Sequence, residues 1–153
     1  MAGKRRCAVL CNRAGSKSHD AALKFGWPIL FCSNNPELRD LDLLVVVVAN
    51  YGDEELQPDM EQFLLSISKG RCLYALCELG NYFGFEDNSF GCKKEAIRIL
   101  DSLGWRCVYE ISVDSYPELD ESRLMPWVEA VKKHDENAIG QSRSRQENPA
   151  ASA

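Results

Sequence analysis

The apolar positions of the chain fall into short continuous runs, separated by stretches in which apolar residues recur every three or four positions. The most hydrophobic run begins at Leu43, contains four consecutive valines and leads into the polar turn that ends at Asp53. A run this short and rich in β-branched residues is typical of a strand buried on both faces of a parallel sheet. Together with four similar runs it predicts five strands, at residues 7–11, 28–33, from 43 onward, 72–77 and 105–113.

The stretches between these strands have the spacing of one face of a helix. A brief helix is expected over residues 18–25, a second from Pro58 to Gly70, and a third over residues 92–103 that ends at Gly104, a residue suited to a helix carboxyl cap. A last helix follows, with Pro126 near its expected start. The stripes expected to face the sheet are Met60, Phe63, Leu64 and Ile67; Ala96, Ile97, Leu100 and Leu103; and Leu124, Trp127, Val128 and Val131.

This alternation of strands and helices predicts an α/β fold, in which a parallel sheet with right-handed crossovers carries helices on both faces. In such sheets ligands bind outside the carboxyl ends of the strands, so the turn after the valine strand is a candidate site. The composition becomes too polar to pack from about Asp135. We therefore expect one domain over residues 1–134 and a disordered tail over residues 135–153.

Composition narrows the class of protein. An apolar fraction of 45% in 153 residues is enough for one core. The seven cysteines include no C-x-x-C pair, so we expect reduced thiols that pack as small core residues rather than a metal or redox motif. The apolar run after the basic residues 4–6 is too short for a signal peptide, and no run approaches a membrane span. These features predict a soluble cytoplasmic protein.

The net charge of −5 is unevenly distributed. No basic residue lies between Arg39 and Lys69, whereas this interval contains seven acidic residues. Such an excess disfavours nucleic acid as a partner and favours a basic protein. The acidic residues are Asp40, Asp42, Asp53, Glu54, Glu55, Asp59 and Glu61.

The turn after the first strand combines small residues with polar chemistry. Asn12-Arg13-Ala14-Gly15-Ser16-Lys17-Ser18 joins a strand to the start of a helix, where free N–H groups carry partial positive charge. Serine hydroxyls and a lysine at this place could complete a phosphate site. The spacing matches neither G-x-G-x-x-G nor the P-loop, so an ordinary strand-to-helix connection is the alternative.

Two later loops, in order and separated by a helix, resemble those of the flavodoxins. Asn50-Tyr51-Gly52-Asp53 is similar to the family's second flavin loop, commonly Thr-Trp/Tyr-Gly-Asp. The stretch from Leu76 to Phe90 resembles the third loop, commonly Gly-x-Gly-Asp-x-x-Gly-Tyr followed by Asn-Phe. Val113-Asp114 with Trp127-Val128 resembles the closing segment, and the fifth strand carries no insertion, as in the short-chain type. The resemblance implies a flavodoxin-like three-layer sandwich with strand order 2-1-3-4-5.

The resemblance also implies a non-covalent FMN site. It assigns the aromatic faces that hold the flavin ring to Tyr51 and Phe85, and the ring edge to Asn81 and the neighbouring backbone. Gly52 allows the backbone angles with which the Gly52-Asp53 peptide could turn its carbonyl toward flavin N5. The full set of expected cofactor-binding residues is Asn12, Gly15, Ser16, Lys17, Ser18, Asn50, Tyr51, Gly52, Asp53, Glu78, Leu79, Gly80, Asn81 and Phe85.

The sequence departs from the family pattern in two loops. The first loop lacks two of the usual hydroxyls, so Lys17 or Arg13 could supply the charge that holds the phosphate. In the third loop Glu78, Asn81 and Phe85 replace the usual glycine, aspartate and tyrosine. A carboxylate at position 78 is expected to crowd the ring and to repel a reduced, anionic flavin.

Three functions are compatible with these residues. The first is an electron carrier, not an enzyme, that shuttles single electrons between a flavoprotein reductase and an acceptor. Its acidic flavin edge, formed by Asp53, Glu54, Glu55, Glu86 and Asp87, would steer basic redox partners; we expect a monomer. The second is a flavodoxin-like interaction module that has lost FMN, and the third is an FMN-dependent reductase of small molecules.

Overall fold

The computed structural model describes residues 6–51, 55–80, 91–115 and 118–141. For Tyr51, Glu55 and residues 135–141 it describes the backbone alone.

Five parallel strands form the centre of the molecule. They are β1 (Cys7–Cys11), β2 (Ile29–Phe31), β3 (Leu43–Tyr51), β5 (Leu73–Gly80) and β6 (Arg106–Asp114), in the spatial order β2-β1-β3-β5-β6. A two-residue strand, β4 (Glu55–Leu56), pairs antiparallel with the end of β3 and lies off this path. With β4 set aside, the order is 2-1-3-4-5, which confirms the predicted topology.

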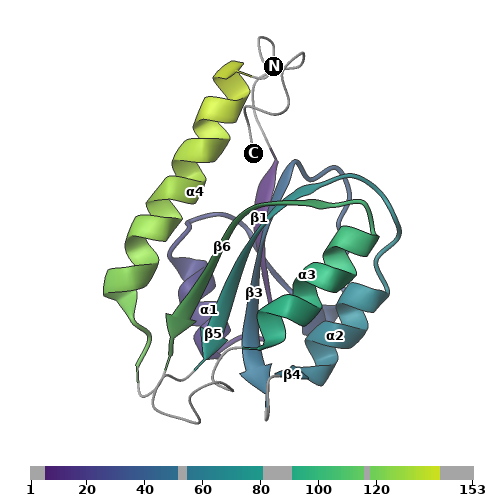
Figure 1. Cartoon of the computed structure of the whole chain (residues 1–153), viewed down its shortest axis with the longest axis vertical. Coiled ribbons are helices and arrows are strands. Elements are labelled where there is room, and N and C mark those ends of the chain that lie inside the picture. Colours follow the sequence, from purple (N-terminus) through teal and green to yellow (C-terminus); the bar gives the residue numbers. More distant parts are fainter. Residues whose placement is uncertain (1–5, 52–54, 81–90, 116–117, 142–153) are drawn as a thin grey trace.

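Helices cover both faces of this sheet, as Figure 1 shows. α1 (Lys17–Leu23) and α4 (Glu121–Gln141) lie on one face, and α2 (Pro58–Leu65) and α3 (Cys92–Ser102) lie on the other. The valines of β3 alternate between the two layers: Val45 and Val47 pack toward α1 and α4, whereas Val46 and Val48 pack toward α2 and α3. The predicted three-layer α/β fold and the burial of the valine strand on both faces are therefore confirmed.

The carboxyl end of α3 is fixed by a Schellman motif. Gly104 has φ +95°, its N–H donates to the Asp101 carbonyl at 3.0 Å, and the Trp105 N–H donates to the Leu100 carbonyl at 3.3 Å. Leu100 and Trp105 both belong to the core beneath the helix. This arrangement satisfies carbonyls that the helix end would otherwise leave unpaired, and it confirms the helix end predicted at Gly104.

Several element boundaries differ from the prediction. β2 ends at Phe31, where a 3-10 turn over Cys32–Asn34 begins. α2 ends at Leu65 rather than near Gly70, because the Ser66 hydroxyl donates to the Phe63 carbonyl at 2.6 Å and competes with helix continuation. Ile67 still packs against the core, but from outside the helix.

The carboxyl end of β5 lies three residues beyond the predicted one. Residues 78–80, expected to begin the third loop, all pair with β6, and Glu78 and Leu79 pair with β3 as well. The extension places Glu78 opposite Val48 and Ser112, and Leu79 opposite Ala49 and Val113. Pairing on both sides overrides the loop character suggested by a charged residue and a glycine.

α4 also exceeds its expected length. It begins at Glu121 and continues through Pro126, which cannot donate the N–H that would pair with the Ser122 carbonyl. Burial of the four predicted residues Leu124, Trp127, Val128 and Val131 against the sheet offsets that loss and confirms the predicted stripe. The helix reaches Gln141, so residues 135–141 are helical rather than part of a loose tail; adding residues to a formed helix is easier than nucleating one. The predicted disorder of residues 142–153 lies outside the described residues.

Candidate functional site

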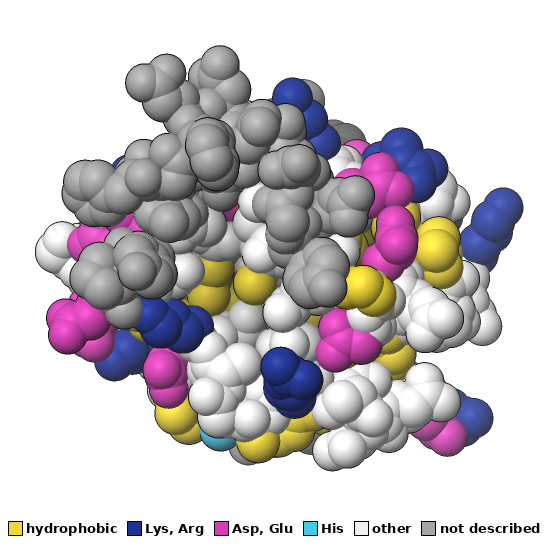
Figure 2. All heavy atoms as spheres, turned by 90° about the horizontal axis from the view of Figure 1, so that it is seen from below, with side chains coloured by type: hydrophobic (Ala, Val, Ile, Leu, Met, Phe, Trp, Pro, Cys, Tyr) yellow, Lys and Arg dark blue, Asp and Glu magenta, His cyan; other side chains and the backbone are white. Residues whose placement is uncertain are grey.

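The carboxyl ends of the parallel strands meet at one edge of the sheet. Because β1, β3, β5 and β6 run in the same direction and in register, the segments that follow Cys11, Tyr51, Gly80 and Asp114 begin side by side. Figure 2 views the molecule from this edge, and charged side chains of both signs surround it. Every loop to which the sequence assigned cofactor binding starts here, which makes this edge the candidate site.

The first loop is held together by its own polar groups. Ser16 caps the amino terminus of α1, because its hydroxyl oxygen accepts the His19 N–H at 3.1 Å. That oxygen also lies 2.8 Å from the Arg13 carbonyl and 3.1 Å from Oδ1 of Asn12, which is buried. Gly15 makes the turn at φ +83°, where its N–H donates to Nδ1 of His19 at 3.0 Å.

Four of the five predicted first-loop residues therefore sit in a compact turn: Asn12, Gly15 and Ser16 at its centre, and Ser18 buried in the first turn of α1. His19, to which no sequence pattern assigned a role, completes the turn through its Nδ1 atom and packs edge-on against Phe31 with the ring centres 5.1 Å apart. Its position four residues after Gly15 is the signal that could have identified it.

Lys17 reaches out of this loop to another strand end. Its ammonium donates to the Ser115 carbonyl at 2.6 Å, across 98 positions of sequence. Ser115 follows the last residue of β6, and its own N–H and hydroxyl both donate to the Gly80 carbonyl, at 2.9 and 3.1 Å. The structure thus brings Lys17 and Gly80, both predicted site residues, together through a serine that sequence reasoning did not single out.

Asn50 closes the amino terminus of α3. Its Oδ1 atom accepts the N–H groups of Gly91 and Cys92, both at 3.2 Å. The N-cap position itself is Gly91, which has no side chain with which to cap the helix. An amide from the end of β3 therefore satisfies donors that α3 cannot satisfy by itself.

Glu78 binds the same helix terminus. Its carboxylate is buried, with 1% of the residue exposed, and accepts the Lys93 N–H at 2.7 Å and the Ser112 hydroxyl at 2.7 Å. The Cys92 thiol lies 3.4 Å from the same carboxylate. Charge on a carboxylate at this place is favourable because the helix amino terminus carries partial positive charge.

This position corrects the expectation that Glu78 projects toward the flavin. The side chain lies on the α2 and α3 face of β5, on the same side as Tyr74 and Leu76. Leu79 points to the opposite layer and packs with Val113. The two-residue period of a strand running past residue 77 could have predicted both orientations.

The cysteines near this edge are buried and inert in character. Burial, reinforced by the charge of Glu78, raises the pKa of Cys77 to about 12 and raises that of Cys92 as well. Burial likewise raises the pKa of Cys11 to about 11. All seven cysteines are free of disulfides, consistent with their predicted packing role.

The rest of the predicted site falls outside what the structure describes. Gly52, Asp53, Asn81 and Phe85 lie outside the described residues, and Tyr51 is described by its backbone, which pairs with Glu55. The aromatic sandwich between Tyr51 and Phe85 therefore stays a prediction. Within the described ranges, no helix is long and apolar enough to cross a membrane.

Comparison with known proteins identifies the fold. A scan of protein-family models finds no match, and neither does a search of curated proteins. Among solved structures, oxidised flavodoxin 1 from Bacillus cereus aligns with 84% of this chain and 97% of its own, at 16% identity and a TM-score of 0.66. Flavodoxin from Fusobacterium nucleatum, bound to flavin mononucleotide, aligns over 83% and 96% of the two chains, at 16% identity and a TM-score of 0.62.

The same fold also occurs in a protein that is not named a flavodoxin. The Trp repressor binding protein from Bacillus subtilis aligns over 80% of this chain and 94% of its own, at 10% identity and a TM-score of 0.59. The chain therefore has the flavodoxin fold, and the resemblance inferred from the loops is confirmed at the level of architecture. At these identities the comparisons establish the fold alone.

Proposed function

We propose that this protein binds FMN non-covalently at the carboxyl edge of its sheet and carries single electrons between a flavoprotein reductase and an acceptor. The observation that carries the proposal is the convergence, within a flavodoxin fold, of the ends of β1, β3 and β5. The loops that resemble the flavodoxin flavin loops follow β3 and β5, the two strands paired at the centre of this edge.

The described residues fit such a group. The Glu78 carboxylate, the strongest sequence-level objection, is turned beneath α3 and hydrogen-bonded there, so it does not project from the edge. In the first loop the Arg13 side chain is exposed beside the turn at Gly15, where a phosphate could be paired with a guanidinium. The backbone of Glu78 and Leu79 is used by the sheet, so the proposed ring-edge contacts fall to Asn81 and the residues after it.

Bound FMN would supply the redox chemistry, because a flavin accepts and releases electrons one at a time. The chain would position the flavin ring and exclude water from it. Tyr51 and Phe85 would hold the ring between aromatic faces, and Gly52 would allow the peptide beside the ring to rotate. Asn50 and Glu78 would fix the start of α3, and with it the end of the long loop between β5 and α3.

Partner docking belongs to the same proposal. The acidic residues assigned to the flavin edge, Asp53, Glu54, Glu55, Glu86 and Asp87, would attract a basic redox partner and raise its association rate at low salt. Their side chains lie outside the described part of the chain.

One observation favours a second candidate, an interaction module without cofactor. The first-loop groups that a phosphate would need are already engaged within the chain: Ser16 caps α1 and Lys17 binds the Ser115 carbonyl. A fold shared with a protein named as a repressor-binding protein is consistent with this alternative.

The absorption spectrum of the purified protein separates the two candidates. The carrier predicts yellow protein with flavin bands that releases FMN in a ratio of about one per chain on denaturation. Colourless protein that leaves the fluorescence of added FMN unchanged would favour the interaction module. Flavin bands that are bleached by a reductant and return on addition of a small-molecule oxidant, with turnover, would instead indicate the reductase.

A further inference from the structure

We propose that Lys17 is a positioning residue, which sets the separation between the first and third loops by way of Ser115, and is not a ligand of the cofactor phosphate. This inference rests on the proposed FMN site. It concerns residues that the sequence analysis assigned to direct cofactor binding, and it gives Lys17 and Gly80 a different role.

A continuous chain of hydrogen bonds links Lys17 to Gly80 through Ser115. The Lys17 ammonium donates to the Ser115 carbonyl at 2.6 Å, a short charge-assisted bond, and Ser115 donates twice to the Gly80 carbonyl. Gly80 is the last residue of β5, immediately before the stretch that resembles the third flavin loop. Three segments from distant parts of the sequence therefore meet at one serine.

Lys17 occupies an electrostatically unfavourable place in its helix. It is the first residue of α1, where the helix dipole disfavours a positive charge. A lysine here is stabilised when its ammonium moves to an acceptor away from the helix axis, and the Ser115 carbonyl supplies that acceptor. The bond therefore removes an electrostatic cost within α1 while it connects two loops.

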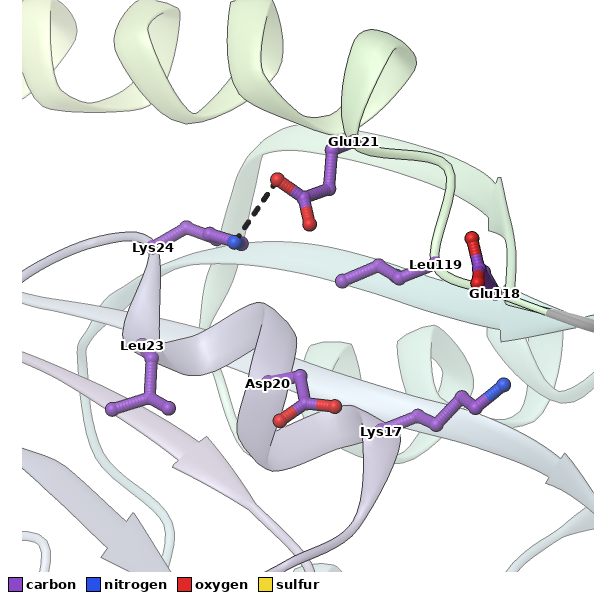
Figure 3. A pocket seen from close by; sticks show the side chains of 7 residues that line it. All are labelled: Lys17, Asp20, Leu23, Lys24, Glu118, Leu119 and Glu121. Atoms are coloured by element: carbon purple, nitrogen blue, oxygen red, sulfur yellow. Dashed lines mark ion pairs between the residues drawn. The ribbon is translucent and has the colours of Figure 1, made fainter.

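α1 is attached to the same segment at a second point, through Lys24. Lys24, seven positions after Lys17 and so on the same side of the helix, forms an ion pair with Glu121 at 3.1 Å. Figure 3 shows this pair and the side chain of Lys17, with Leu119 between them in a hollow that has a volume of about 550 Å³. The Asp120 N–H donates to the Asp114 carbonyl at 2.8 Å and closes the segment that carries Ser115.

These contacts hold the β6–α4 segment between α1 and the end of β5. The Arg123 guanidinium adds a bond to the Ser112 carbonyl at 2.7 Å, which fixes the start of α4 on β6. Loss of the Lys17 ammonium would free the Ser115 carbonyl and loosen the Gly80 end of the third loop. Arg13, exposed in the same loop, remains the cation available to a phosphate.

The affinities for FMN and riboflavin distinguish a positioning role of Lys17 from direct binding of the phosphate, because riboflavin lacks the phosphate of FMN. The proposal predicts that Lys17→Met weakens FMN and riboflavin by the same factor, about 5- to 10-fold, and that Lys17→Arg restores both. Arg13→Gln should weaken FMN alone. Lys24→Met is the matched control: it removes the other attachment of α1 and should change either affinity by less than about twofold.

Amide resonances of the flavin-free protein test the connection without any cofactor. Lys17→Met should shift the resonances of Ser115 and Gly80, and Lys24→Met should leave that of Gly80 in place. The proposal is overturned if Lys17→Met weakens FMN but not riboflavin, if it weakens neither, or if both resonances stay unchanged. Wild-type protein that binds neither flavin refutes the proposed function, and the resonances then decide alone whether Lys17 positions Gly80.

Discussion

Oε2 of Glu78 accepts the backbone N–H of Lys93 at 2.7 Å, which ties the end of β5 to the first turn of α3. The other carboxylate oxygen accepts the Ser112 hydroxyl at 2.7 Å, so one buried side chain joins two strands and a helix. Asn50 adds two bonds to the same helix terminus from β3. The start of α3 is therefore fixed from two neighbouring strands.

Replacement of Glu78 by Ala should lower the free energy of unfolding by about 2–4 kcal/mol, because it leaves buried donors unpaired and removes a cap. Urea denaturation followed by circular dichroism measures this change. Glu95→Gln, which removes an exposed ion pair with Arg98 on the same helix, is the control and should cost no more than about 0.5 kcal/mol. Equal effects of the two substitutions would mean that Glu78 contributes only as a surface charge.

Replacement of Asn50 by Ala should cost about 1–2 kcal/mol of stability, because the N–H groups of Gly91 and Cys92 lose their acceptor. Hydrogen exchange provides the specific measurement. Protection should fall at the first turn of α3 and stay unchanged in the carboxyl-terminal turn, which the Schellman motif holds. Uniform loss of protection along α3 would contradict a capping role.

Replacement of Gly104 by Ala tests whether the backbone at this position lies too close to Gly70 to admit a Cβ atom. Gly26→Ala is the matched control. Both glycines have positive φ, but a Cβ atom at position 104 would lie 2.8 Å from the Gly70 carbonyl oxygen, whereas one at position 26 would meet nothing within 4 Å. Gly26→Ala should cost about 1 kcal/mol through backbone strain alone, and Gly104→Ala about 1–2 kcal/mol more. Thermal unfolding of the two variants would show this difference; equal losses would exclude the contact with Gly70.

We expect the protein to lose stability at alkaline pH, because burial raises the pKa of several of its cysteines. Burial raises the pKa of Cys11 and Cys107 to about 11, and of Cys32 and Cys77 to about 12, from 9.0. Because folding favours the protonated thiol, this stabilisation is fully present below pH 9 and is lost as the pH rises toward 11–12. Urea midpoints should fall across this range. Absorbance of thiolate in the native protein at pH 9–10 from these four residues would contradict the prediction.

The helix layers and the buried valine strand could be predicted from the sequence because they follow from apolar patterns that extend over whole elements. The strand order came instead from the resemblance of the loops to those of the flavodoxins. Glu78, Leu79 and Gly80 were misplaced because a charged residue and a glycine suggest a loop, and only pairing with Val48 and Ser112 makes them a strand. The contacts of Lys17 with Ser115 and of Asn50 with Cys92 join positions 98 and 42 residues apart. No local pattern encodes such pairs.

Substitution of Tyr51 tests the proposal that Tyr51 and Phe85 hold the flavin ring between them. Tyr51→Ala should weaken FMN by about 5-fold or more, on the order of 1 kcal/mol, through loss of ring stacking. Tyr51→Phe retains the ring and should bind FMN within about twofold of wild type. An unchanged dissociation constant for the alanine variant would remove Tyr51 from the site.

Titration of the flavin-free, full-length protein with FMN tests most directly whether the loops at the carboxyl edge form one flavin site. The account predicts quenching of FMN fluorescence that saturates at about one FMN per chain, because a flavin held against an aromatic ring is quenched. Fluorescence that stays equal to that of free FMN, up to about 100 μM protein, would contradict it, since binding weaker than about −5.5 kcal/mol would not support a resident cofactor.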